Sequence, residues 1–408
     1  MKRMLAIVCL LAAAIAAGWA QQLYVVSGSV SDQHSRQPLP HASVSAGGVS
    51  TVTNEQGRFT LKLSARPAAV VASMLGYKTQ ALTPTDGRQL SFRLQPASIQ
   101  LSEVLVRAST AEELVRTALA KVPQNYSTAA MLYKGFYRET VQKRSHFIAI
   151  SEAVVDLYKT SYQQASTSRD RVAITRGRRL LNMKPADTLG VKIMGGPMLP
   201  VIADVVKNDQ LLFYADDMPC YEFSLETPQL MGDRLQYVVT MKPRHERPYA
   251  LFHATLYIDQ QSLALTRAEL QLDMSNRQHA TSAMLHHKPL TLRFRPRELT
   301  FVIDYRTEQG VTHLSYVRNT IRFNCDWRRR LFSSPFTVTS EFVVTHRQPA
   351  AAPPPRGSDT FSRRDKLYDR VEYFSDPHFW GPDNIIEPTE TLDKAVDRLK
   401  RRVAEAKQ

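Results

Sequence analysis

The stretch Asn54 to Thr79, NEQGRFTLKLSARPAAVVASMLGYKT, decides how the N-terminal region folds. Its first residues, Asn54 to Gly57, are typical of a turn, because glycine adopts positive φ freely and an asparagine side chain bonds to the backbone that follows it. From Phe59 to Leu63 every second residue is apolar, which predicts a strand with one buried face. Residues Val70 to Met74 are mostly apolar and suit a central strand covered on both sides.

Similar short strands and turns lie on both sides of this stretch. Alternating residues in Val26 to Val30 and in Leu90 to Leu94 predict further strands, and Gly47-Gly48 predicts a turn between two others. A run of short strands separated by turns over residues 24–107 indicates a small β-sandwich.

Four short motifs follow one another in this region. They are Gly28-Ser29-Val30, Pro38-Leu39-Pro40-His41-Ala42-Ser43-Val44, Thr53-Asn54-Glu55-Gln56-Gly57-Arg58-Phe59 and Ser73-Met74-Leu75-Gly76-Tyr77. This set resembles the carboxypeptidase-regulatory-like, transthyretin-like domain, in the version that opens many TonB-dependent outer-membrane receptors. The resemblance implies a transthyretin-like β-sandwich. Asn54 stands where the family usually has aspartate, and because either residue caps the turn we expect an unchanged fold.

A zinc carboxypeptidase would need two histidines and one glutamate around an open metal position. No histidine in the chain is followed three positions later by glutamate, and H-E-x-x-H does not occur. His279, His286 and His287 form the densest histidine group, which we interpret as a polar loop rather than a metal site. We therefore expect no carboxypeptidase, no metal site and no cofactor, despite the name of the N-terminal domain.

The first 20 residues have the composition of a secretory leader. Lys2 and Arg3 precede an apolar run from Met4 to Ala17, and small residues follow at a plausible cleavage site. The run is short for a helix that spans a bilayer, which needs about 20 residues. We expect residues 1–20 to be a cleaved signal peptide and the protein to be exported, either to the periplasm or to the outer membrane.

The chain is basic, with a formal net charge of +15 from 53 Lys and Arg against 38 Asp and Glu. Export makes nucleic acid an improbable partner. Anionic lipid, anionic glycan and outer-membrane or periplasmic proteins are the candidate partners, and an unspecialised basic surface is the simpler alternative. Cys220 and Cys325 remain after cleavage, and an exported protein permits a disulfide between them, which the sequence leaves open.

The rest of the chain is predicted to be mainly β. Residues 109–122 have one apolar helical face, with a capping box at Thr110 and Glu113 and an expected end at Pro123. Residues 130–346 contain consecutive long strands with short turns, which predict an antiparallel sheet curved into an open half-barrel. Residues 347–408 begin as a proline-rich linker and end in a tail with a helix over 391–405.

This second region also resembles an exported bacterial family. The residues concerned are Asn125-Tyr126, Phe136-Tyr137-Arg138-Glu139, Leu256-Tyr257-Ile258-Asp259, Phe379-Trp380-Gly381 and Asn384-Ile385-Ile386. Members of that family join the same N-terminal domain to a β-rich region of uncharacterised function, so the resemblance implies no agreed activity. The strand-turn-strand strip around Asp259 is also similar to lipoprotein-carrier-like half-barrels.

Three carboxylates could do acid-base chemistry. Glu139, Glu152 and Asp156 lie in predicted strands, and Glu152 and Asp156 share a strand face. Glycoside hydrolysis needs two carboxylates at a defined separation, and an apolar wall raises the pKa of a neighbouring acid. The structural alternative is pairing with Arg138 or another arginine.

Several basic and aromatic residues are candidates for interaction. Arg176, Arg178 and Arg179 form one cluster, and Arg328 to Arg330 beside Trp327 form another. Solvated surface charge is the simpler interpretation of both clusters, and binding to lipid phosphates or acidic glycans is the functional alternative. Phe379 and Trp380 should pack on the chain's own sheet or on a partner. The complete set of candidate residues is Arg138, Glu139, Glu152, Arg178, Arg179, Trp327, Phe379 and Trp380.

The sequence thus predicts a non-enzymatic, exported envelope protein. Its curved β-sheet would bind an amphiphilic ligand or dock onto an outer-membrane partner. Two alternatives remain open, a glycan-acting hydrolase that uses paired carboxylates and a small outer-membrane barrel-associated protein.

Overall fold

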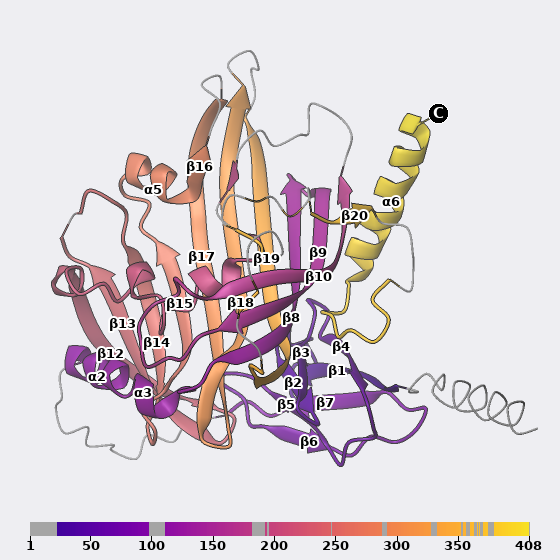
Figure 1. Ribbon diagram of the computed structural model, residues 1–408, viewed down its shortest axis with the longest axis horizontal. Helices are drawn as coiled ribbons and strands as arrows, with labels where there is room; N and C mark the ends of the chain where they lie inside the picture. The colour runs from indigo at the N-terminus through magenta and orange to yellow at the C-terminus, as the bar shows by residue number, and fades with distance from the viewer. Residues whose placement is uncertain are drawn as a thin grey trace, which may run out of the picture.

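The computed structural model places most of the chain in two β-rich units (Figure 1). It describes residues 23–97, 111–181, 192–193, 196–245, 247–287, 292–327, 333–351, 354–355, 360–362, 365, 367, 370–373 and 379–407. The predicted leader, Thr110 and Arg328 to Arg330 lie outside these ranges. For Trp327, His286 and His287 the backbone is described and the side chain is not.

The N-terminal domain is a sandwich of two small sheets. Its strands are β1 (Tyr24–Asp32), β2 (Ser43–Ala46), β3 (Val49–Val52), β4 (Arg58–Leu63), β5 (Val70–Ser73), β6 (Gln80–Leu82) and β7 (Leu90–Leu94). One sheet has the order β4-β1-β7 and the other β3-β2-β5-β6. Alternating side chains of β4 enter the core as predicted, with Phe59 and Leu61 buried, and each contributes about 1.5–3 kcal/mol through burial.

The predicted turn before β4 requires its glycine. Gly57 has φ +70°, and a Cβ there would lie 2.4 Å from the carbonyl oxygen of Val30. The Asn54 side chain accepts hydrogen bonds from the backbone N–H groups of Gln56 and Arg58, at 2.9 and 3.0 Å. The turn chemistry read from the sequence is therefore confirmed.

A large curved sheet follows. Its strands are β8 (Met131–Lys143), β9 (His146–Lys159), β10 (Arg171–Leu181), β12 (Tyr221–Met231), β13 (Arg234–Pro243), β14 (Phe252–Asp259), β15 (Leu265–Leu272), β17 (Leu292–Glu308), β18 (Val311–Trp327), β19 (Ser334–Pro349) and β20 (Glu372–Tyr373). Their order is β12-β13-β14-β15-β17-β18-β19-β8-β9-β10-β20. Neighbours are antiparallel except β20, which runs parallel to β10. The sheet is open, with β12 and β20 at its two ends, as the half-barrel prediction required.

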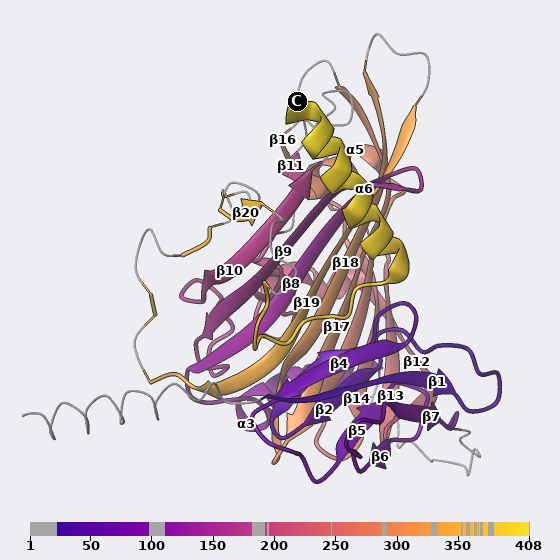
Figure 2. The same cartoon turned by 90° about the vertical axis from the view of Figure 1, so that its right-hand side faces the viewer.

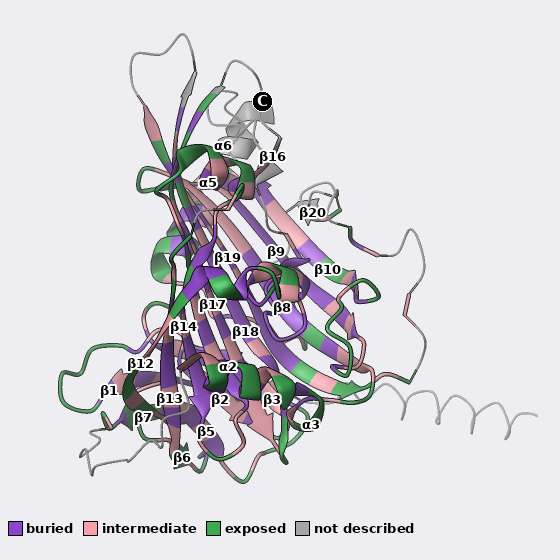
Figure 3. Cartoon of the chain, turned by 90° about the vertical axis from the view of Figure 1, so that its left-hand side faces the viewer, coloured by how far each residue is buried: buried purple, intermediate pink, exposed green. Residues whose placement is uncertain are grey.

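Short helices lie against the concave face of this sheet (Figure 3). They are α2 (Ala111–Ala120), α3 (Val122–Asn125), α4 (Leu199–Ile202), η2 (Asp209–Leu211), η3 (Met218–Cys220) and α5 (Arg277–Met284). A two-stranded ribbon of β11 (Lys192–Ile193) and β16 (Leu285–His287) accompanies them. No helix within the described residues is long and apolar enough to cross a membrane.

The helix after the N-terminal domain differs from the prediction at its end. We expected Pro123 to terminate it, but α2 already ends at Ala120 and Pro123 lies in the first turn of α3. Proline suits that position because the first helical N–H groups have no intrahelical partner and its φ is already helical. Residues 277–284, which include His279, form helix α5 rather than the predicted polar loop, with Asn276 capping its N-terminus.

The C-terminal tail lies on the opposite, convex face (Figure 2). It passes between the N-terminal domain and the sheet and ends in α6 (Glu390–Lys407), whose Leu392 and Leu399 pack on Ile150 and Leu180 of β9 and β10. Cys220 and Cys325 are both buried, and neither forms a disulfide.

Candidate functional site

Strands β8, β9 and β10 bring together three of the predicted site residues on the convex face. Their register places Arg138 opposite Glu152, and Glu152 opposite Arg178. Arg138 Nε donates to Glu152 Oε1 at 2.7 Å, and Arg178 Nε donates to Glu152 Oε2 at 2.8 Å. Each carboxylate oxygen therefore binds one guanidinium. We call Arg138, Glu152 and Arg178 the arginine clamp.

The clamp keeps its carboxylate ionised. Glu152 is only 1% exposed, and burial alone would raise its pKa. The two guanidinium groups outweigh burial, and the pKa of Glu152 lies below its ordinary value. A general acid needs a protonated carboxyl near neutral pH. The clamp is therefore suited to holding structure rather than to donating a proton.

The tail covers this clamp. The Trp380 ring packs edge-on against Phe136 at 5.3 Å between centroids, and the Arg178 guanidinium lies 4.9 Å from the Trp380 centroid. Arg138 also donates to the carbonyl oxygen of Ile386 at 2.9 Å. Trp380 is 5% exposed, so the packing of Trp380 on the chain's own sheet, expected from the sequence, is what the structure has.

Phe379 is held at the rim of the same contact. Its carbonyl oxygen accepts a hydrogen bond from Arg176 at 2.8 Å, and the Arg176 and Arg178 guanidinium groups lie 5.8 and 5.7 Å from its ring centroid. Arg176 and Arg178, for which the sequence left open a solvated surface or the binding of lipid or glycan, thus contact the protein's own tail. Arg179 has the opposite strand parity and belongs to the concave side of β10.

The other side of the tail binds the edge of the N-terminal domain. The Asn384 side chain accepts a hydrogen bond from the backbone N–H of Lys62 at 2.8 Å and donates one to the carbonyl oxygen of Lys62 at 2.9 Å. It thus makes the two backbone hydrogen bonds that a neighbouring strand would make with this edge residue. Thr51 donates to the carbonyl oxygen of Ile385 at 3.1 Å. Residues 379–390, which make these contacts with both units, are called the strap.

Asn54 gains a role here that the sequence did not reveal. Its Nδ2 donates to the carbonyl oxygen of Pro388 in the strap at 3.1 Å, while its Oδ1 holds the turn. Aspartate, the usual residue of the family at this position, could accept the turn hydrogen bonds but has no N–H to donate. The departure from the family pattern therefore fits the binding of the strap.

A second polar contact joins the N-terminal domain directly to the sheet. The His41 ring stacks on Tyr316 of β18 at 5.8 Å, and its Nε2 lies 3.3 Å from Glu55. Arg318 also binds Glu55, at 3.0 Å. The His41 hydrogen bond, assisted by Arg318, lowers the pKa of Glu55 to about 2. With the strap, this contact fixes the two β-rich units against each other.

Glu139 lies on the concave face instead. It accepts a hydrogen bond from the Tyr137 hydroxyl at 2.7 Å, and that hydroxyl accepts from the backbone N–H of Gly196 at 3.0 Å. Burial raises the pKa of Glu139. Burial also raises the pKa of Asp156, which shares the convex face with Glu152. Because Glu139 and Glu152 are on opposite faces, they cannot act as a catalytic pair across one substrate.

Residues 199–220, which we call the inner segment, pack on the concave face, and a cavity of about 600 Å³ beside them is lined in part by Ile202 and Lys207. Leu199 and Val201 of α4 are buried in the same core as Tyr305 and Phe342 of the sheet. Asp204 of this segment is fully buried and accepts hydrogen bonds from the hydroxyl groups of Tyr305 and Tyr162, at 2.8 and 2.7 Å.

Two buried ion pairs fasten the inner segment. Lys159 Nζ lies 2.5 Å from Asp204, and Lys207 Nζ lies 3.0 Å from Asp170. Burial, and then the nearby Lys159, lower the pKa of Lys207. The sequence interpretation missed these residues, although strand parity places Lys159 on the same face as Leu157 and would have shown a charge facing the core.

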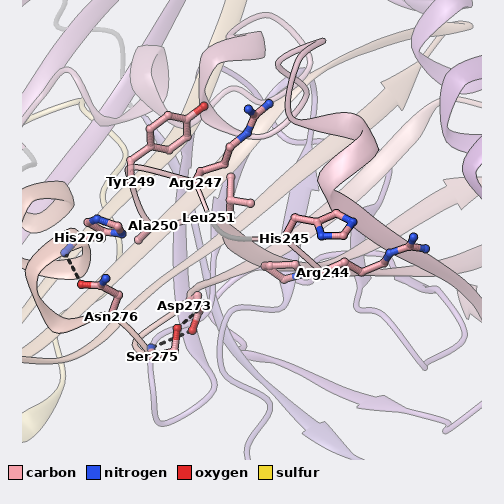
Figure 4. A pocket seen from close by; sticks show the side chains of 11 residues that line it. Arg244, His245, Arg247, Tyr249, Ala250, Leu251, Asp273, Ser275, Asn276 and His279 are labelled. Carbon is pink, nitrogen blue, oxygen red and sulfur yellow. Dashed lines mark hydrogen bonds between the residues drawn. The ribbon is translucent and has the colours of Figure 1, made fainter.

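A small pocket opens where β13, β15 and α5 meet (Figure 4). It encloses about 110 Å³ and is lined in part by Arg244, His245, Tyr249 and His279. His245 and Arg244 point away from His279, so the two histidines do not converge. Within the described part of the chain, no group of three His, Cys, Asp or Glu residues could hold a metal ion.

Comparisons with known proteins identify the N-terminal region. Residues 26–106 match the family model of the CarboxypepD_reg-like domain. No curated protein sequence matches the chain. A DUF1329 family protein from Desulfovibrio piger ATCC 29098 is similar at 10% identity, with a TM-score of 0.25 over 59% of this chain and 92% of that chain.

A second solved structure is a domain from Vibrio parahaemolyticus with a provisional assignment to outer-membrane lipoprotein sorting. It is 9% identical, with a TM-score of 0.27 over 59% of this chain and 94% of that chain. Function must therefore be argued from the sites of this chain itself.

Proposed function

We propose that this chain, whose N-terminal region is a carboxypeptidase-regulatory-like domain, is a non-enzymatic docking protein of the bacterial cell envelope. The N-terminal domain and the strap hold the curved sheet in one orientation, and the sheet presents a binding surface to an envelope partner or amphiphile. The secretory composition of residues 1–20 supports the envelope location.

One observation carries this proposal. Both broad faces of the curved sheet contact the chain's own segments, the concave face through the inner segment and the convex face through the strap and α6. The part of the sheet left for a partner is therefore the end that lies farthest from the N-terminal domain. There β17, β18 and β19 continue beyond the shorter strands β12 to β15 (Figures 1 and 2).

The hydrolase alternative loses its main support. It needs an acid and a second carboxylate facing one substrate. Glu139 lies on the other face of the sheet from Glu152. Asp156 shares the face of Glu152, but Glu152 is 1% exposed beneath the strap and bound by two arginines, so the pair cannot flank one substrate. Docking therefore accounts for these residues better than hydrolysis does.

Site-specific photo-crosslinking in intact cells tests the proposal. A photoreactive residue replaces Asn324, which lies opposite Arg295 at the far end of β18. The matched position is Gln89, which is exposed in the N-terminal domain at the other end of the molecule. We expect adducts with an envelope protein or lipid from position 324 and few from position 89. Adducts only from position 89, or none from position 324, would overturn docking through the sheet.

A further inference from the structure

Four exposed arginines lie on one face at the far end of the sheet. They are Arg293, Arg295 and Arg297 of β17 and Arg322 of β18. The alternating residues of β17, such as Phe294, are buried in the concave core, so the arginines of this strand belong to the convex face. We call the four the arginine end.

The arginine end is remote from the N-terminal domain. Arg306, on the same strand, contacts Ser43 of that domain. At about 3.3 Å per residue, the strand between Arg295 and Arg306 spans about 35 Å. The arginine end therefore lies far from the contact of Arg306 with the N-terminal domain.

Positive charge exceeds negative charge on this face. Glu298 lies 3.0 Å from Arg322 and neutralises one guanidinium. The register places Asp326 opposite Arg293. Exposed Arg297 adds a further positive charge, and exposed Arg144 follows in the hairpin between β8 and β9. A net excess of guanidinium groups remains at one end of a chain that carries +15 overall.

We propose that the arginine end binds the phosphate groups of an anionic phospholipid surface. This inference rests on the proposed docking function and names an anionic phospholipid surface as the docking partner. Guanidinium groups bind phosphate oxygens through two parallel hydrogen bonds, and the attraction of each basic residue to an anionic leaflet adds to that of the next.

A lipid surface fits this face better than a protein partner does. Protein interfaces bury an apolar centre with aromatic anchors inside a polar rim. Next to the arginines on the convex face lie the polar side chains of Asn324 and Thr337 and the small ring of exposed Pro335, and the neighbouring phenylalanines face the core. A cationic face with no exposed aromatic anchor among its described residues is complementary to phosphate headgroups.

Vesicle co-sedimentation of the full mature chain tests this inference. We expect the protein to bind vesicles of phosphatidylglycerol and phosphatidylethanolamine and not vesicles of phosphatidylcholine. Binding should fall as NaCl rises from about 50 to about 500 mM, because salt screens exposed charges. R293E/R295E/R297E/R322E should bind anionic vesicles at least about tenfold more weakly.

A matched variant controls for total charge. R36E/K78E/R88E/R93E reverses four exposed basic residues of the N-terminal domain and should bind within about twofold of the unchanged protein. Circular dichroism checks that both variants are folded, and R295Q/R297Q replaces the fourfold variant if it is not.

Three outcomes overturn the inference. The first is no binding to anionic vesicles at low salt, and the second is equal loss of binding in both variants. The third is binding of a soluble anionic oligosaccharide with no binding of vesicles. If position 324 still cross-links to an envelope protein, the docking function stands and only the lipid assignment fails.

Discussion

Neighbouring strands β8 and β9 carry two glutamates, one buried and one partly buried, whose surroundings differ. On the convex face, Glu152 lies between two arginines under the strap, and its pKa is lowered. On the concave face, Glu139 meets neutral hydrogen-bond donors, and burial raises its pKa. The same residue type is thus held as a carboxylate on one face and favoured as a carboxylic acid on the other. The charge of Glu152 thus helps to hold the strap on the convex face, whereas a charge on Glu139 is unfavourable.

Glu152→Gln should have the largest effect on this comparison. It leaves two guanidinium groups buried without a counter-charge, which costs about 3–5 kcal/mol of unfolding free energy. Because the folded pKa of Glu152 is lowered, its stabilisation is present above pH 4.5 and is lost as pH falls through the folded pKa. Urea unfolding at pH 7 and pH 4 measures both effects. Asp156→Asn, on the same strand face, is the control and should change stability little. An equal effect of the two substitutions would contradict the clamp.

Trp380→Ala tests whether the strap protects the clamp. The substitution removes the ring between Phe136 and Arg178 and should cost about 3 kcal/mol, as buried aromatic truncations do. Limited proteolysis should then cut near residues 379–390 faster. Tyr249→Ala removes an exposed aromatic ring far from the strap and serves as the control. Unchanged proteolysis would mean that the strap does not depend on Trp380.

Asn54→Asp tests the contact between the N-terminal domain and the strap on the convex face. Aspartate preserves the turn but loses the donor to Pro388 and places a charge against a carbonyl oxygen. We expect a loss of about 1–2 kcal/mol in the unfolding free energy. Hydrogen exchange should increase at the strap and remain unchanged in the turn itself. Faster exchange in the turn alone would assign Asn54 a local role only.

Glu139→Gln should have the smallest effect, in the opposite direction. At pH 7 the partly buried carboxylate costs stability, so glutamine should stabilise the protein by up to about 1 kcal/mol. A raised folded pKa means that the native protein gains stability as pH falls towards 4.5, where the difference between the two proteins should disappear. Thermal unfolding across pH 4.5 to 8 measures it. A destabilised variant at pH 7 would show that ionised Glu139 has a cationic partner.

Much of the fold followed from local patterns. Strand alternation from Phe59 to Leu63 and the turn at Asn54 depend on neighbouring residues alone, and both are as predicted. The packing of Trp380 on the chain's own sheet also followed, because an exposed indole ring is costly.

The remaining features depend on register and tertiary packing. Sequence indicated that an arginine could pair with Glu152, but the pairing of β9 with β8 and β10 decides that two arginines do so. The inner segment has no regular periodicity, and its burial depends on ion pairs such as Lys159 with Asp204 between distant segments. The second role of Asn54 required a tail more than 300 residues away, since its contact with Pro388 spans 334 positions.

Native mass spectrometry of the purified mature chain after a high-salt wash tests the central claim most directly. If docking uses the end of the sheet and the inner segment occupies the concave face, the measured mass should equal that of the polypeptide alone. A lipid or other amphiphile retained at one molecule per chain would contradict this, because it would place the ligand in the cavity of about 600 Å³ beside the inner segment rather than at the end of the sheet.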